Sequence, residues 1–200
     1  MNYYISDLHF GHKNVLKFDN RPYFTLTEMK EDIIKRWNER VKKNDNVYIL
    51  GDVFWYNDEA VEILEQLKGN LFLLKGNHDR LNSEMEKYFV WVKDIAVVKD
   101  KSANGEEHHV VLSHFPIAHW QGQDHNPPYI HLYGHIHDGR DTRPFEQYGR
   151  MWEQATGKPF MAMNVGCMKD YMDYTPRTLD EIMSAWQNER NLRWDGMINR

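Results

Sequence analysis

The stretch VYILGD, residues 47–52, carries the pattern that decides the fold, because four apolar or aromatic residues are followed at once by glycine and aspartate. Short runs of this kind, closed by turn residues, are typical of buried strands. Four other strand-like runs also lead directly to Asp, Asn or His, in the segments YYISDLH (3–9), LFLLKGNHD (71–79), VVLSH (110–114) and IHLYGHIH (130–137). Since the carboxyl ends of strands in α/β sheets open into a common crevice, we expect these polar side chains to converge.

Seven of the side chains that follow these runs are candidate metal ligands: Asp7, His9, Asp52, Asn77, His114, His135 and His137. Oxygen and imidazole donors without a thiolate suit divalent ions such as manganese, iron or zinc. Seven ligands are too many for one tetrahedral zinc but suit two ions that share Asp52. Each short motif alone is also compatible with an ordinary turn, a helix cap or a solvated histidine. Their occurrence in order, after five strands, favours the metal site.

The amino-acid composition argues against several classes of protein. The 200 residues include 25 Lys+Arg and 30 Asp+Glu, which gives a formal charge of −5 and argues against a protein that coats nucleic acid through a broad basic surface. No apolar run approaches the roughly 18 residues of a membrane span, and the first residues lack a basic, apolar leader pattern. The single cysteine, Cys167, suits a reducing compartment. We expect one domain over residues 1–200, in the cytoplasm and without a membrane partner.

The remaining chain alternates strand-like and helix-like patterns, which predicts an α/β or layered α+β domain. A helix should follow Thr25 or Thr27, with Met29, Ile33, Ile34, Trp37 and Val41 on one face. Further helices are expected at about 57–68 and about 178–192, and a further strand at Ile95–Val98. Asn104-Gly105 predicts a hairpin before the strand at 110–112. Residues 115–128 and 138–158 show no clear period and are predicted to be long active-site loops.

The ordered motifs Asp-x-His, Gly-Asp, Gly-Asn-His-Asp, a single His after a strand and Gly-His-x-His resemble the calcineurin-like metallophosphoesterase superfamily. The segments SDLHFGHKN (6–14), NRPY (20–23) and SHFP (113–116), with Trp120, are similar to a small-enzyme branch found in bacteria and their phages. The resemblance implies a four-layer α/β/β/α sandwich with mixed sheets and a dinuclear metal centre. It assigns Asp7, His9, Asp52 and His137 to the first ion, and Asp52, Asn77, His114 and His135 to the second.

The resemblance also implies a mechanism, in which a metal-bridging hydroxide attacks phosphorus and His78, in the outer shell, acts as general acid. Two divalent ions are expected, with Mn²⁺ first and Fe, Zn, Ni or Co as alternatives. Protein phosphatases of the superfamily carry Gly-Asp-x-x-Asp-Arg, whereas this chain has GDVFWY at 51–56. The difference disfavours a protein phosphatase and leaves Asp79 or Asp58 as candidates to orient His78.

The leading hypothesis for the reaction is hydrolysis of a small phosphodiester of the nucleotide, cyclic-nucleotide or RNA-end class. A phosphomonoesterase is the alternative, and a nuclease or a non-catalytic scaffold is remote, because no broad basic surface is expected and every ligand position is intact. Candidate substrate contacts are His12, Arg21, Trp120, Arg140 and Arg143, since arginine binds phosphate with two hydrogen bonds.

Overall fold

Two four-stranded sheets form the centre of the molecule in the computed structural model, which describes residues 1–56, 58–137 and 139–198. The first sheet is parallel throughout, in the order β1-β2-β3-β4. The second has the order β5-β6-β7-β8, with an antiparallel β5–β6 pair and two parallel pairs. The strands are β1 (Asn2–Ile5), β2 (Asn46–Ile49), β3 (Asn70–Leu74), β4 (Phe89–Lys93), β5 (Ile95–Lys101), β6 (Glu107–Ser113), β7 (Ile130–Tyr133) and β8 (Ala162–Asn164).

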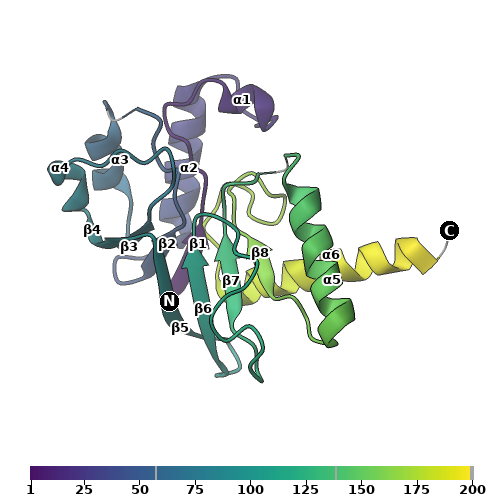
Figure 1. Ribbon diagram of the computed structural model, residues 1–200. Coiled ribbons are helices and arrows are strands. Elements are labelled where there is room, and N and C mark those ends of the chain that lie inside the picture. Colours follow the sequence, from purple (N-terminus) through teal and green to yellow (C-terminus); the bar gives the residue numbers. More distant parts are fainter. Residues whose placement is uncertain (57, 138, 199–200) are drawn as a thin grey trace.

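Helices cover the outer faces of both sheets, so the fold is a four-layer sandwich (Figure 1). The helices α2 (Leu26–Arg40), α3 (Ala60–Gln66) and α4 (Ser83–Glu86) lie beside the first sheet, and α5 (Thr142–Thr156) lies beyond the second. The helix α6 (Leu179–Ile198) contacts β1 and β8, an edge strand of each sheet. The short helix α1 (Val15–Phe18) stands in the connection after β1. The architecture expected from the sequence is therefore confirmed. No helix in the described part of the chain is both long and apolar enough to cross a membrane.

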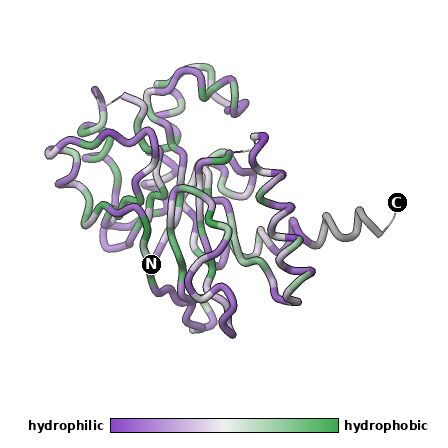
Figure 2. Tube along the Cα trace, in the orientation of Figure 1, coloured by the Kyte–Doolittle hydropathy of each residue, from purple (hydrophilic) through white to green (hydrophobic). Residues whose placement is uncertain are grey.

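The first long helix shows why the sequence folds this way. The Thr25 side chain accepts a hydrogen bond from the Glu28 backbone N–H at 3.1 Å and caps the start of α2. The helix buries Met29, Ile33 and Trp37, whose spacing places them on one face. Hydrophobic stretches follow the central strands in Figure 2, where the two sheets share one apolar core. Packing in this core holds the strands of both sheets in place, and with them the strand ends that carry the candidate ligands.

Most elements expected from the sequence are confirmed, including all six expected strands and the hairpin at Asn104-Gly105 between β5 and β6. The helix expected at about 57–68 is α3, and Asn57 lies outside the described residues. The C-terminal helix is α6, which continues beyond residue 192 to Ile198. The strands β4 and β8 were not anticipated, and β8 has only three residues.

The prediction of a loop over 138–158 is wrong, because most of this segment is the helix α5. Its apolar side chains Phe145, Tyr148 and Trp152 recur at helical spacing, and Phe145 and Tyr148 pack against Phe160. The helix was missed because Pro144 and Gly149 lie within the segment, and both residues are typical of loops. The helix ends at Gly157, whose φ of 68° is the left-handed conformation of a glycine cap. Residues 114–129 contain no helix or strand, as expected for 115–128.

Candidate metal centre

Two clusters of potential metal ligands lie at the carboxyl ends of the strands. Asp7, His9 and His137 form the first, and Asp52, His114 and His135 form the second; within each cluster the ligand atoms lie within 4.8 Å of one another. The seventh predicted ligand, Asn77, places its Oδ1 3.1 Å from His114 Nε2. Asp52 joins the clusters, since its Oδ2 lies 3.4 Å from His114 Nε2 and 3.7 Å from His9 Nε2. The structure thus brings all seven predicted ligands together.

Each cluster draws its residues from both sheets. The first combines Asp7 and His9, after β1, with His137, after β7. The second combines Asp52, after β2, with His114 and His135, after β6 and β7. The His135 backbone N–H also donates to both carboxylate oxygens of Asp7 at 3.1 Å. The site is therefore built across the seam between the two sheets.

Hydrogen bonds at the outer ring nitrogens fix how two of the histidines face the site. His114 Nδ1 lies 2.7 Å from the Leu50 carbonyl oxygen and donates there. Its Nε2 faces the oxygens of Asn77 and Asp52. His137 Nδ1 likewise donates to Asp19 Oδ1 at 2.6 Å, and its Nε2 then faces His9 Nε2 at 3.2 Å. With Nδ1 held in this way, both rings present Nε2 to the site, where a bound divalent cation would take it as a ligand.

Burial and neighbouring charge set the protonation of the cluster. Burial lowers the pKa of His9 to about 2, so its imidazole is neutral and its lone pairs are available. Burial alone would raise the pKa of Asp52, but the hydrogen bond and charge of His114 and the His78 backbone N–H lower it to about 2. Burial also disfavours the charged form of His137, whereas Asp19 and Asp7 raise the pKa of that ring. The result is an ionised carboxylate beside imidazoles, the donor set of a metal site.

The backbone is strained at most of these positions. Asp7, His9, Asp52, His135 and His137 have φ values between 41° and 70°, in the left-handed region that residues with a side chain rarely adopt. Such conformations cost about 1–3 kcal/mol each and persist where the surrounding structure holds them in place, commonly at functional sites. The strain therefore marks five of the seven residues that the motif pattern selects.

Two glycines allow the loops to approach one another. A Cβ on Gly134 would lie 2.0 Å from Ser6 Oγ and 2.6 Å from Asp7 Oδ2. A Cβ on Gly76 would lie 2.3 Å from Asp52 Oδ1. Real Cβ atoms do not come this close, so the turns that carry the ligands require glycine at both positions.

Asp79 has a different role from the one predicted. Its carboxylate accepts backbone hydrogen bonds from Asp52 and Gly76 at 2.9 Å and from Val53 at 2.8 Å, so it holds the β2 and β3 turns together. It is not recorded in contact with the His78 side chain, and neither is the exposed Asp58 in the described structure. Both proposals for the group that orients His78 are therefore unsupported.

His78 lies beside the clusters and remains open to solvent. Its side chain is 36% exposed, and its Nε2 lies 3.9 Å from Asp52 Oδ2. Its backbone N–H donates to Asp52 Oδ1 at 2.9 Å. The ring contacts Trp55, with centroids 4.5 Å apart, and Trp55 in turn stacks on His12 at 3.7 Å. His78 therefore lies between the Asp52 carboxylate and the ring of Trp55, and Trp55 belongs to the segment 51–56, where the superfamily's protein phosphatases carry their Asp and Arg.

Asp19 and Arg21 form a supporting pair that sequence reasoning did not assign. Arg21 Nε and Nη2 donate to Asp19 Oδ2 at 3.1 and 2.9 Å, while Asp19 Oδ1 accepts from His137. Arg21 also donates at 2.8 Å to the carbonyl oxygens of Asp7 and Leu8. Arg21 was predicted to bind substrate, and that prediction is wrong, because its buried guanidinium is used by these internal contacts. Asp19 is identified as a supporting residue only by its contact with His137 in the folded structure. A single acidic residue in a loop belongs to no sequence motif that would reveal this role.

The other predicted substrate contacts differ in their surroundings. His12 is buried 5.4 Å from the ring of His9 but is covered by Trp55. Trp120 is buried in the second apolar cluster and donates to the Tyr129 carbonyl oxygen at 3.0 Å, so its assignment to the substrate is wrong. Arg140 and Arg143 are exposed near the start of α5, and their role stays a prediction.

The fold and the clusters together define a hydrolase-type metal site on an α/β/β/α sandwich. The sequence profile of the calcineurin-like phosphoesterase superfamily domain matches residues 3–179. The chain belongs to this superfamily, and its clustered His and Asp residues are of the kind that can hold a divalent metal ion.

Three other proteins are similar to this chain in sequence or in fold. An uncharacterized protein of Methanocaldococcus jannaschii is 41% identical over 85 residues, which are 41% of this chain and 48% of that protein. The match thus spans about half of the archaeal relative. The gene 66 protein of Mycobacterium phage L5 is 28% identical over 159 residues, 68% of this chain and 76% of the phage protein. A crystal structure of a protein of unknown function from Aquifex aeolicus shares the fold, with a TM-score of 0.66, 23% identity and coverage of 92% of this chain and 98% of that one.

Proposed function

We propose that the protein is a phosphodiesterase for small esters that uses two divalent ions, one in each cluster. The observation that carries the proposal is Asp52, whose Oδ2 lies within 3.7 Å of imidazole nitrogens from both clusters, as a shared ligand requires. Bound there, the ions would activate water and offset the charge of the phosphoryl oxygens. Manganese is our first choice because the donors are mixed oxygen and imidazole, and iron, zinc, nickel and cobalt remain alternatives.

His78 supports the proposal as the proton donor. It is solvent-accessible and stands 3.9 Å from the shared carboxylate, so its imidazolium can approach a leaving oxygen held over the clusters. Asp52, through the His78 backbone N–H, fixes the position of the segment that carries this ring. Proton donation matters most for alkoxide leaving groups, which are the leaving groups of ordinary phosphodiesters.

The substrate class that we propose is a nucleotide, a cyclic nucleotide or an RNA end. A formal charge of −5 gives no broad basic surface for a long nucleic acid, which favours a small ester over a polymer. A phosphomonoester is the second candidate, because the metal clusters suit either ester. A cytoplasmic location is part of the proposal, since the buried Cys167 is the sole cysteine and no internal disulfide can form.

The test is metal analysis combined with hydrolysis of bis- and mono-p-nitrophenyl phosphate after loading with manganese. We expect about two ions per chain and faster hydrolysis of the diester. Faster hydrolysis of the monoester would support the phosphomonoesterase instead. Inactivity on both esters at full metal loading would contradict the proposed enzyme and support a scaffold.

A further inference from the structure

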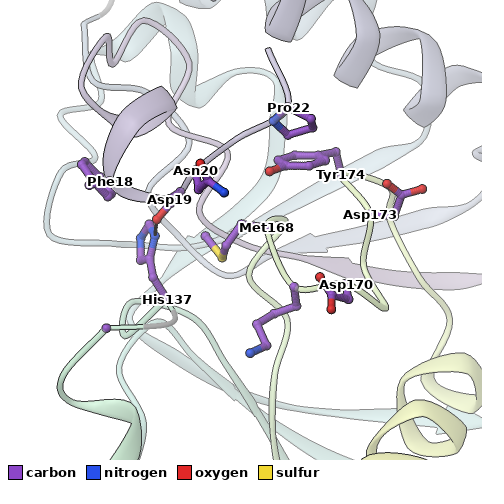
Figure 3. A pocket seen from close by; sticks show the side chains of 11 residues that line it. Phe18, Asp19, Asn20, Pro22, His137, Met168, Asp170, Asp173 and Tyr174 are labelled. Atoms are coloured by element: carbon purple, nitrogen blue, oxygen red, sulfur yellow. Dashed lines mark hydrogen bonds and ion pairs between the residues drawn. The ribbon is translucent and has the colours of Figure 1, made fainter.

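A cavity of about 770 Å³ borders the first cluster at His137 (Figure 3). Its other walls come from residues 18–22, which follow α1, and residues 168–174, which follow β8. The volume is within the range of small-molecule sites. His137 is the only one of the seven predicted ligands among the described lining residues, and it connects the cavity with the first cluster.

Backbone strain singles out this cavity. Outside the five predicted ligands, the described chain has three non-glycine residues with a left-handed backbone: Asn20 at 51°, Asp173 at 44° and Tyr174 at 53°. All three line the cavity. A bulky residue such as tyrosine is a true outlier in this region. Strain of this kind clusters at ligand-binding positions, so the cavity has the same signature as the metal site.

Polar groups with open hydrogen-bonding capacity face the cavity. Tyr174 is only 7% exposed, and its ring is held edge-on against Tyr23 at 5.1 Å and under the Arg21 guanidinium at 5.7 Å. Its hydroxyl points toward Asn20 in Figure 3, and no described group is recorded as its hydrogen-bond partner. The Asn20 amide and the Asp170 carboxylate also lack a recorded partner in the described structure. The cavity therefore offers a phenol, an amide and a carboxylate to a ligand.

The charges around the cavity disfavour an anionic ligand. Of its acids, Asp19 pairs with Arg21, and Asp173 pairs with Arg36 at 2.8 Å. Lys169 is the one lysine or arginine among the described lining residues, against three aspartates, which argues against a second phosphate group. Apolar surface from Phe18, Pro22 and Met168 completes the walls. A flat, neutral group with hydrogen-bond donors and acceptors on its edge fits this combination.

We propose that the cavity binds a nucleoside, as the substituent that stays on phosphorus during the reaction. This inference rests on the proposed phosphodiesterase function and names its substrate class. His78, the proton donor, does not line the cavity, so the leaving group must lie on the other side of the phosphoryl group. Hydroxide from water bonds to phosphorus, the bond to the leaving oxygen breaks with its electron pair, His78 protonates that oxygen, and a nucleoside monophosphate remains.

The test compares two esters that share p-nitrophenolate as the leaving group: thymidine 5′-(p-nitrophenyl phosphate) and methyl p-nitrophenyl phosphate. For the manganese-loaded protein we expect kcat/KM to be at least about tenfold higher with the thymidine ester. Tyr174→Phe removes the hydroxyl and keeps the ring, and Asn20→Gly removes the amide and keeps the left-handed backbone. Each should lower the ratio of the two kcat/KM values about 3- to 10-fold, as expected for one lost hydrogen bond. Tyr148→Phe, on α5 and outside the cavity lining, is the matched control and should keep the ratio.

Failure of this inference is distinct from failure of the proposed function. If both esters are hydrolysed with equal kcat/KM, or if the variants keep the wild-type ratio, the nucleoside site is wrong while the phosphodiesterase stands. If neither ester is hydrolysed, the proposed function fails, and binding of thymidine itself still tests the cavity. Saturation-transfer NMR with metal-loaded protein should show thymidine bound to the wild type and more weakly to Tyr174→Phe, and no transfer in the wild type would overturn the inference.

Discussion

Asp19 shows how much a single carboxylate determines at this site. One of its oxygens accepts from His137 Nδ1 and the other from Arg21, so the proton of the His137 ring is held on the side away from the cluster. The ring can then offer only Nε2 to a metal. Arg21, whose side chain is fully buried, locks the carboxylate in turn. The ion pair of Arg21 and Asp19 thus positions His137, a ligand that follows a strand of the second sheet.

Asp19→Asn should weaken metal binding about 10- to 100-fold, because an amide neither neutralises Arg21 nor fixes the His137 tautomer as well. Calorimetric titration with Mn²⁺ measures the affinity. Asp124→Asn removes an exposed carboxylate and should leave the affinity unchanged. Wild-type affinity in Asp19→Asn would show that the pair is not needed to position His137.

His78→Ala should reduce kcat about 10²- to 10⁴-fold on an unactivated phosphodiester such as a dinucleotide, since the alkoxide then leaves without a proton. The loss should be much smaller with p-nitrophenolate, which needs little protonation. Metal content, measured by elemental analysis, should stay the same, and His125→Ala, at an exposed position, should behave as wild type. Full activity of His78→Ala on the dinucleotide would exclude the proton-donor role.

The turns that follow the strands are the elements that assemble the site. Parallel register sets Ile5 beside Ile49 and Ile49 beside Leu73, so the ends of β1, β2 and β3 are nearly level. The same holds in the second sheet, where Leu112 lies beside Leu132. The ligands can then converge only if the turns pack closely. Gly76 and Gly134 stand where these turns come closest, because a side chain would not fit at either position.

Gly134→Ala should separate the turns after β1 and β7, because the new methyl group would lie 2.0 Å from Ser6 Oγ and 2.6 Å from Asp7 Oδ2. We expect a loss of about 1–3 kcal/mol in the free energy of unfolding, typical of overpacking, together with reduced metal content. Urea denaturation measures the first. Gly139→Ala, whose added Cβ would meet nothing closer than 3.4 Å, should change stability by less than about 0.5 kcal/mol. Equal stability of the two variants would contradict this account.

At the scale of the whole molecule, the metal site ties two layers together. Each cluster contains residues from both sheets, so an ion in either cluster cross-links the sandwich. A ligand that binds the native state alone stabilises it by about 2.7 kcal/mol at 100 times its dissociation constant. Metal binding should therefore be visible in the stability of the whole chain.

Removal of metal should lower the melting temperature by about 5–10 °C, from the stabilisation above and the usual 2–4 °C per kcal/mol for a chain of this length. Calorimetric melting with excess Mn²⁺ and with EDTA measures the difference. Asp52→Asn should melt at nearly the same temperature under both conditions, because it lacks the shared carboxylate. A wild-type protein insensitive to EDTA would contradict cross-linking by metal.

Stability should also fall between pH 6.5 and pH 4 because of His131. This ring is fully buried in β7, burial lowers its pKa to about 4, and both its nitrogens are hydrogen-bonded to backbone groups. The unfolded chain takes up the proton near pH 6.5 and the folded chain only near 4, so acid favours unfolding. The expected loss from this residue is about 2 kcal/mol at pH 5 relative to pH 7.

Urea denaturation of the EDTA-treated protein at pH 7 and pH 5 measures this effect. His131→Gln can keep a polar contact without titrating, so its loss of stability over the same interval should be smaller by about 2 kcal/mol. An identical pH dependence in the two proteins would contradict the assignment. The other histidines are the same in both proteins, so their contribution to the pH dependence cancels in the comparison.

The sequence was sufficient for the strands and for the ligands that follow them. Asp7, Asp52 and His135 could be selected because each stands directly after an apolar run, and the parallel sheets then bring the run ends together. The helix α5 was missed because Pro144 and Gly149, two residues typical of loops, lie within it although its apolar residues recur at helical spacing. Arg21 was misassigned because a buried arginine and a substrate-binding arginine are identical in sequence.

The sequence by itself determined the superfamily, the order of the strands along the chain and the residues that carry the metal chemistry, because these depend on local patterns that follow from backbone geometry. Only the tertiary structure decided the partners of those residues: Asp19 behind His137, Asp79 beneath the turns, Trp55 beside His78 and Tyr174 over a cavity at the first cluster. Such partners come from chain segments whose separation in sequence carries no period. They meet only when two sheets and their loops pack, so no local pattern encodes them.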